Sequence, residues 1–161
     1  MSTFDLKPSK EIVAAISKWE GGLGAGGLFH PYQDGGGVWT IGFGHTGNVG
    51  PHSKPLTLKQ AEALLWQDLE HHYVPAVVAI HRLEEQKQFD ATLSFVFNDG
   101  TGMLEPQHTF GHYLELREFK KAASSLNLYV HDALGHVEDG LVRRRKWEEQ
   151  LFLGGTYTVH N

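Results

Sequence analysis

Residues 19–47 read WEGGLGAGGLFHPYQDGGGVWTIGFGHTG, and this stretch decides how the chain is organised. Glu20 stands at the expected C-terminal end of an amphipathic helix, while Asp34 and Thr40 follow in a hairpin punctuated by glycines. Enzymes that cleave glycosidic bonds typically use two carboxyl groups that lie in different local surroundings. The stretch therefore predicts a hairpin presented against the end of a helix, with one acid on each.

Helical segments are expected on both sides of this hairpin. Ser9 can cap a helix over Lys10–Glu20, and the glycines that follow Glu20 end it. Thr57 opens a capping-box pattern, and the helix behind it is expected to run to about His81 with a kink at Pro75. Further helices are expected over residues 86–98, 108–114, 117–126 and 142–153.

The order of these elements predicts an α+β fold in one domain over residues 1–161. Residues 21–56 form the expected β lobe, and residues 1–20 and 57–161 form the larger helical lobe. At 161 residues and 18.0 kDa, the chain is long enough to bury a core without cross-links, and it contains no cysteine.

The charge and hydropathy of the chain exclude several classes of partner. With 14 basic and 19 acidic side chains, the net charge of −5 argues against nucleic acid, which is bound by basic surfaces. No stretch approaches the roughly 20 apolar residues that span a bilayer, so no membrane insertion is expected. The first thirty residues show no export signal, because their longest apolar run is Ile12–Ile16.

Three motifs of the chain resemble phage-type lysozymes, the endolysins of one glycoside hydrolase family. The first is Glu20–Gly21 followed by the run from Tyr32 to His45, the second lies within 88–100, and the third is the G-L-V-R-R-R helix over 140–152. They occur in the family order and together span residues 19–153. The resemblance implies a small β-hairpin lobe and a larger helical lobe, joined by a long helix, with the sugar-binding cleft between them.

The resemblance also implies the catalytic roles. Glu20 would be the general acid, and the negative end of its helix disfavours the ionised carboxylate. Asp34 would act on a water as base or electrostatic stabiliser, and Thr40 would fix the position of that water. An inverting mechanism follows, with the two carboxyl groups roughly 6.5–9.5 Å apart.

Other positions match supporting or sugar-contacting residues of the family. Thr46, Phe97 and Asn98 match positions that touch sugar, although Phe97 fits a place in the helix core equally well. His45 is expected to pair with Asp68 on the long helix.

The arginine run Arg143–Arg145 has two interpretations. It is either a basic patch for the anionic cell wall or a helix end that places one arginine near the catalytic acid. Arg144 is the arginine expected beside Glu20, since its spacing to Phe152 suits the family.

One departure from the family lies between the two acids. Thirteen residues separate Glu20 from Asp34, more than is usual, and the extra residues fall within 21–27. This glycine-rich insertion is either a tolerated surface loop, the preferred interpretation, or a flexible gate beside the cleft.

The eleven histidines do not predict a metal site. His108 and His112 have zincin spacing, but the glutamate that H-E-x-x-H requires is absent, and no cysteine is available. Neither a metal nor another cofactor is expected.

The expected activity is that of a cofactor-free muramidase. It would hydrolyse the β-1,4 bond between N-acetylmuramic acid and N-acetylglucosamine in bacterial peptidoglycan, as a monomeric phage endolysin held in the host cytoplasm until its release to the wall. A lytic transglycosylase, which uses one glutamate and no bound water, and a wall-binding module without activity are the alternatives.

Overall fold

Helix α1 (Lys10–Glu20) begins and ends at the residues that its sequence predicts. The computed structural model describes residues 7–80 and 82–160, so expectations that reach residues 1–6, His81 or Asn161 lie outside the described part. Ser9 Oγ accepts the backbone N–H of Ile12 at 3.0 Å, and Gly21 ends the helix with φ of 60°. The apolar face of α1 is fully buried at Ile12 and Ile16, which fixes the helix against the core.

The β lobe contains one short hairpin. Strands β1 (Tyr32–Gln33) and β2 (Trp39–Thr40) pair antiparallel, with Tyr32 opposite Thr40. Single bridges join Phe29 to Leu56 and Ile41 to His45. The expected hairpin is confirmed, but the strands are short because tight glycine turns interrupt the segment, as at Gly42, where φ is +64° and a Cβ would meet Ala61 at 3.5 Å.

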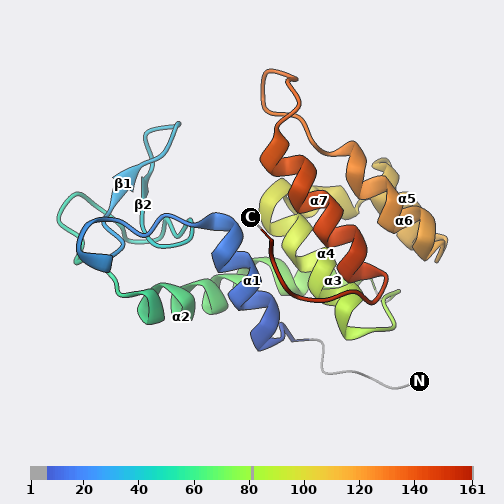
Figure 1. Cartoon of the computed structure of the whole chain (residues 1–161), viewed down its shortest axis with the longest axis horizontal. Helices are drawn as coiled ribbons and strands as arrows, with labels where there is room; N and C mark the ends of the chain where they lie inside the picture. The colour runs from blue at the N-terminus through green and yellow to red at the C-terminus, as the bar shows by residue number, and fades with distance from the viewer. Residues whose placement is uncertain (1–6, 81, 161) are drawn as a thin grey trace.

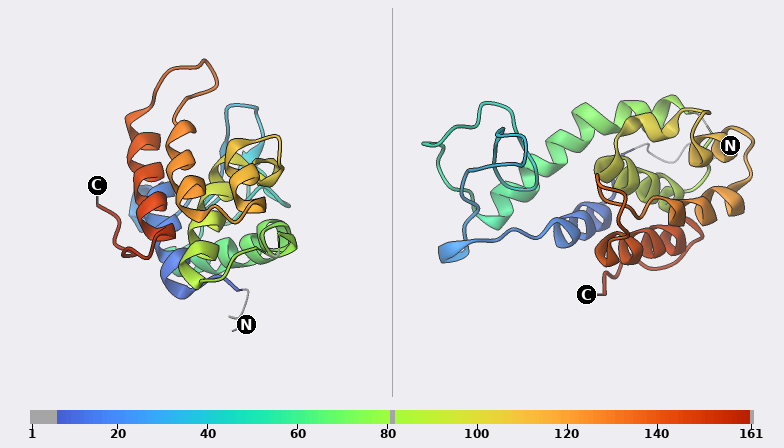
Figure 2. Two further views of the ribbon diagram at one scale, coloured as in Figure 1. Left: turned by 90° about the vertical axis from the view of Figure 1, so that its right-hand side faces the viewer. Right: turned by 90° about the horizontal axis from the view of Figure 1, so that it is seen from above.

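A long helical rod connects the two lobes (Figure 2). It consists of α2 (Leu58–Asp68), a π-helical turn (Leu69–Tyr73) and α3 (Val74–Ala79), and the predicted capping box between Thr57 and Gln60 is present. The irregularity expected at Pro75 takes the form of the π turn that precedes it. Proline has no backbone N–H to donate to the preceding turn, and its ring would collide with a carbonyl group of that turn. A wider turn avoids the collision and does not require the missing hydrogen bond.

The helical lobe is built around α4 (Gln86–Asp99), whose residues 88–96 are all buried. Its other helices are α5 (Thr109–Glu115), α6 (Phe119–Ser125) and α7 (Asp139–Phe152). The start of α7 was expected at Val142, and this was wrong: the helix begins at Asp139, an acid whose place in the first turn suits the helix dipole. Helix α6 begins two residues after the expected Arg117, whose φ of +57° interrupts the chain between α5 and α6.

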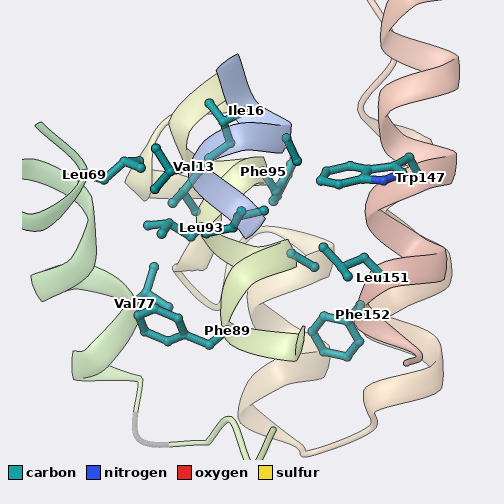
Figure 3. Packing of buried hydrophobic residues seen from close by; sticks show 14 of the residues in the cluster. Val13, Ile16, Leu69, Val77, Phe89, Leu93, Phe95, Trp147, Leu151 and Phe152 are labelled. Atoms are coloured by element: carbon teal, nitrogen blue, oxygen red, sulfur yellow. The ribbon is translucent and has the colours of Figure 1, made fainter. Parts of the chain in front are cut away.

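The core joins α1, the connecting rod, α4 and α7 (Figure 3). Phe89 and Phe95 come from α4, while Trp147 and Leu151 come from α7, and all four are buried. Figure 1 shows α4 and α7 side by side, with the end of α1 between them and the β hairpin. This packing places the last residue of α1 at the junction of the two lobes.

Within residues 7–80 and 82–160, no helix combines the length and the apolar character needed to cross a bilayer.

Candidate active site

Glu20 is the last residue of α1 and forms an ion pair with the helical lobe. Its Oε1 lies 2.8 Å from Nη1 of Arg144 on α7. The Glu20 side chain is 29% exposed, whereas that of Arg144 is only 5% exposed. The carboxylate is thus accessible to a substrate from solvent, while the cation that holds it is fixed in the protein interior.

A buried network holds Arg144. Glu148 Oε1 accepts from Arg144 Nε at 3.2 Å and from the Ser94 hydroxyl at 2.6 Å. Its Oε2 accepts from Arg145 Nη1 at 2.5 Å. Arg145 also donates to Asn98 and to Asp99. These contacts join α4 to α7 directly behind Glu20.

Two hollows meet at Glu20. One, of about 450 Å³, is lined from the α7 side and includes Trp19, Asn98 and Arg144. The other, of about 290 Å³, is lined from the β lobe and includes Tyr32. Glu20 lines both, so its carboxylate stands on the boundary between the hairpin lobe and the helical lobe.

Asp34 and Thr40 lie on the hairpin and share one neighbour, Val38. Asp34 Oδ1 accepts the N–H groups of Gly36 and Val38, each at 2.9 Å, and the Thr40 hydroxyl donates to the Val38 carbonyl at 3.0 Å. The side chains are therefore held in one turn. Asp34 is exposed and Thr40 is buried, and neither lines the two hollows that contain Glu20.

Within residues 7–80 and 82–160, Asp34 Oδ2 has no hydrogen-bond partner, so this oxygen is left for water or substrate.

His45, which follows the hairpin in the β lobe, contacts Asp68, the last residue of α2. Nδ1 of His45 is 2.9 Å from Asp68 Oδ2, and Nε2 is 2.9 Å from the carbonyl oxygen of Gly47. Both ring nitrogens of His45 therefore lie within hydrogen-bond distance of an oxygen atom. The pair attaches the hairpin lobe to α2 and supports the position of the hairpin.

The three sugar-contacting candidates have different surroundings in the structure. Asn98 lines the α7-side hollow together with Glu20, and its Oδ1 accepts from Arg145. Phe97 is half-buried and packs on the ring of Tyr73, with centroids 5.2 Å apart. Thr46 is exposed in the β lobe.

The sequence did not single out Tyr73, Ser94 or Glu148. Tyr73 is the last residue of the π turn. The pKa of its phenol is raised, chiefly because the side chain is half-buried and to a smaller extent because the carboxylates of Asp68 and Glu20 are near. Ser94 and Glu148 lie on buried faces of α4 and α7. For Ser94 the available signal was a polar residue among the apolar residues 93–97 of α4. No such signal marked Glu148, because α7 also carries exposed residues such as Arg143 and Lys146.

The glycine-rich insertion lies on the surface. It contains a short 3₁₀ turn (Ala25–Gly27), and Leu23 within it is 55% exposed. The segment is closed by a hydrogen bond from the Gly24 N–H to the Leu28 carbonyl at 3.0 Å. Gly21 and Gly22, next to Glu20, line the β-lobe hollow.

The fold is an α+β fold with a β-hairpin lobe and a helical lobe, and Glu20, at the end of a helix, lies at their boundary. This combination is typical of lysozyme-like proteins. Residues 23–148 match the model of the phage lysozyme family, and the chain belongs to that family. The match begins just after Glu20, so the choice of Glu20 as an active-site candidate depends on its motif and on its place in the structure, not on the matched segment.

Curated relatives are named endolysins. That of Bacillus phage B103 is 37% identical over 118 residues, covering 73% of this chain and 44% of the relative. That of Salmonella phage P22 is 33% identical over 127 residues, covering 76% and 84%. The chain therefore spans less than half of the length of the first relative, but most of the second.

Solved structures agree with this assignment. The muramidase domain of SpmX from Asticaccaulis excentricus has a TM-score of 0.77 at 30% identity, covering 91% of this chain and 97% of that one. A variant of P22 lysozyme has a TM-score of 0.75 at 30% identity, covering 92% and 99%. The predicted lysozyme-like fold, with a hairpin lobe and a helical lobe, is confirmed.

Proposed function

We propose that this protein is a muramidase that hydrolyses the β-1,4 bond between N-acetylmuramic acid and N-acetylglucosamine in bacterial peptidoglycan. The observation that carries the proposal is the partly exposed carboxylate of Glu20, which stands between the two lobes and is held by the buried Arg144. Membership of the phage lysozyme family and relatives named endolysins support the substrate.

Glu20 is proposed as the general acid. A proton on its carboxyl group would be delivered to the glycosidic oxygen as the bond breaks, which is typically worth 10²–10⁴-fold in rate. Its side chain is accessible through the hollows on both sides, so a sugar chain lying across the boundary of the lobes can reach it. The α7-side hollow would hold one sugar against Asn98, and Phe97 and Thr46 are proposed as further sugar contacts.

Asp34 and Thr40 are proposed to hold the attacking water. The Thr40 hydroxyl gives its hydrogen to the Val38 carbonyl, so its remaining lone pairs can accept a hydrogen from water. The Oδ2 atom of Asp34 would accept the other water hydrogen and become the base. A water held in this way would attack the face opposite Glu20, which gives inversion at the anomeric carbon.

His45 and Asp68 are proposed to support this arrangement rather than to take part in it. Their contact fixes the base of the hairpin on α2, so that the turn bearing Asp34 keeps its place relative to α1.

The biological setting is proposed from the relatives. As a phage endolysin, the protein would collect in the host cytoplasm as a monomer and reach peptidoglycan when a separate protein opens the membrane. Light scattering would give the mass of the particle, and fractionation of lysing cells would show where the protein lies before lysis.

The products of digestion test the activity. Purified peptidoglycan is incubated with the protein, and the soluble muropeptides are identified by mass. We expect saccharides with a reducing N-acetylmuramic acid end, whose first-formed anomer, followed by proton NMR, is inverted. A 1,6-anhydro product would show a lytic transglycosylase, and binding without any released saccharide would show a wall-binding module.

A further inference from the structure

Glu148 is a buried carboxylate that takes no direct part in the proposed reaction. It has no exposed surface, and it accepts hydrogen bonds from Ser94, Arg144 and Arg145. Because burying an ion is costly even when it is paired, stability alone is a weak reason for a glutamate here. Its position directly behind the arginine that holds Glu20 suggests a functional reason.

Arg144 is shared between two carboxylates. Its Nε faces Glu148 at 3.2 Å, its Nη1 faces Glu20 at 2.8 Å, and its Nη2 donates to the Ser94 carbonyl at 3.3 Å. Two of the three nitrogens are therefore fixed on the side away from the solvent. The third is presented to Glu20 in one orientation.

The charges of this network balance without Glu20. Arg144 and Arg145 together carry +2, and Glu148 and Asp99, both paired with them, together carry −2. Ionised Glu20 adds a fifth charge, so the sum becomes −1. An unneutralised Arg144 would stabilise the ionised form of Glu20, which is the wrong form for an acid.

We infer that Glu148 is a positioning residue that enables Glu20 to keep a proton, by fixing Arg144 and offsetting its positive charge. The inference rests on the proposed function, because it explains how an acid paired with arginine remains able to donate. Without Glu148, Arg144 would still contact Glu20, but its positive charge would favour the ionised form of the Glu20 side chain over the protonated form.

Other ionisable groups also surround Glu20. They are Lys18 on α1, Arg143 and Arg144 on α7, Glu138 before α7, Tyr73 on the rod, and His30 and Tyr32 in the β lobe. Within residues 7–80 and 82–160, Arg144 alone among them contacts both Glu20 and Glu148. A change at Glu148 therefore reaches Glu20 chiefly through Arg144.

The test replaces Glu148 by its uncharged analogue, with a neighbouring glutamate as control. Glu148→Gln keeps the shape of the side chain but removes its charge. Glu149→Gln makes the same change at the next residue, which contacts Asn127 and Lys146 instead. Two readouts are taken on each folded protein: the pH–activity profile on peptidoglycan, and the titration of the Glu20 carboxyl carbon followed by ¹³C NMR.

Glu148→Gln is expected to move the alkaline midpoint of activity to lower pH by about one unit, and to move the Glu20 titration in the same direction. Glu149→Gln is expected to leave both unchanged. A folded Glu148→Gln protein with both curves at their wild-type positions would overturn the inference and leave Glu148 with a structural role only.

A second measurement covers the case in which Glu148→Gln does not fold. In the wild-type protein, the Glu148 carbon should show no titration across the pH range in which Glu20 titrates. Titration of the two carbons together would overturn the inference. If the Glu20 curve moves as expected but Glu20→Gln still cleaves peptidoglycan, the coupling holds and the proposed function fails, so the two failures are distinguishable.

Discussion

Asp90 joins three parts of the chain behind the helix that carries Glu20, and its replacement by asparagine should be costly. Ser9 donates its hydroxyl to Oδ2 at 2.6 Å and its N–H to Oδ1 at 3.3 Å. Tyr157 donates to Oδ2 at 2.7 Å, and Gln86 donates to Oδ1 at 3.0 Å. In Asp90→Asn, one oxygen becomes an NH₂ group, so two of these four donors lose their acceptor. At about 1 kcal/mol for each hydrogen bond, the free energy of unfolding should fall by about 2 kcal/mol.

The effect of Asp90→Asn should depend on pH. Burial raises the pKa of Asp90 from its usual 3.8, and the hydrogen bonds from Ser9, Tyr157 and Gln86 oppose that shift only in part. The folded state therefore holds the proton more tightly than the unfolded chain does. The stabilising contribution is complete below the unfolded pKa and is lost as pH rises through the higher folded pKa. Asp90→Asn should thus destabilise more near about pH 4 than near about pH 7.

Urea denaturation followed by circular dichroism measures this effect at both pH values. The control is Glu115→Gln, the same type of change at an exposed residue, which should stay within about 0.5 kcal/mol of wild type. A loss that is larger at pH 7 than at pH 4, or a loss no greater than that of the control, would show that Asp90 does not stabilise the folded protein in this way.

Three further changes test other parts of the account. In Gly111→Ala the new Cβ would overlap the backbone carbonyl oxygens of Leu104 and Glu105, so thermal unfolding should show a loss of about 2 kcal/mol. An unchanged melting temperature would contradict this packing. Deleting Gly22–Gly26 should leave the protein folded and active, because loop length changes closure entropy only slightly; lost activity with unchanged melting would favour a gate. Thr40→Val should lower hydrolysis on the order of 100-fold by displacing the water, and full activity would remove Thr40 from the mechanism.

Features set by nearby residues could be predicted from the sequence. The cap at Ser9 and the capping box at Thr57 each depend on partners within three residues, and both are present. The hairpin followed from its glycines. The π turn over Leu69–Tyr73 could not be predicted in the same way, since no local pattern distinguishes a wider turn from an ordinary one ahead of Pro75.

Features set by distant residues were harder to predict. The sequence motif indicated that one arginine of 143–145 would approach Glu20, and Arg144 does so across 124 positions of the chain. It gave no sign that Arg145 and Glu148 are fully buried, because the run R-R-R-K-W-E-E has the composition of a solvated helix face. Which faces are covered depends on how α4 and α7 pack together, and this is a property of the fold.

If Glu20 supplies the proton for glycosidic bond cleavage, the initial rate of wall hydrolysis should fall sharply in Glu20→Gln. The matched control is Glu11→Gln, the same substitution at an exposed position in the first turn of the same helix. With circular dichroism showing that both variants are folded, Glu20→Gln should lose about 10²–10⁴-fold in rate, while Glu11→Gln stays close to wild type. A folded Glu20→Gln protein that hydrolyses peptidoglycan within about threefold of the wild-type rate would contradict the account, because the reaction would then have another acid.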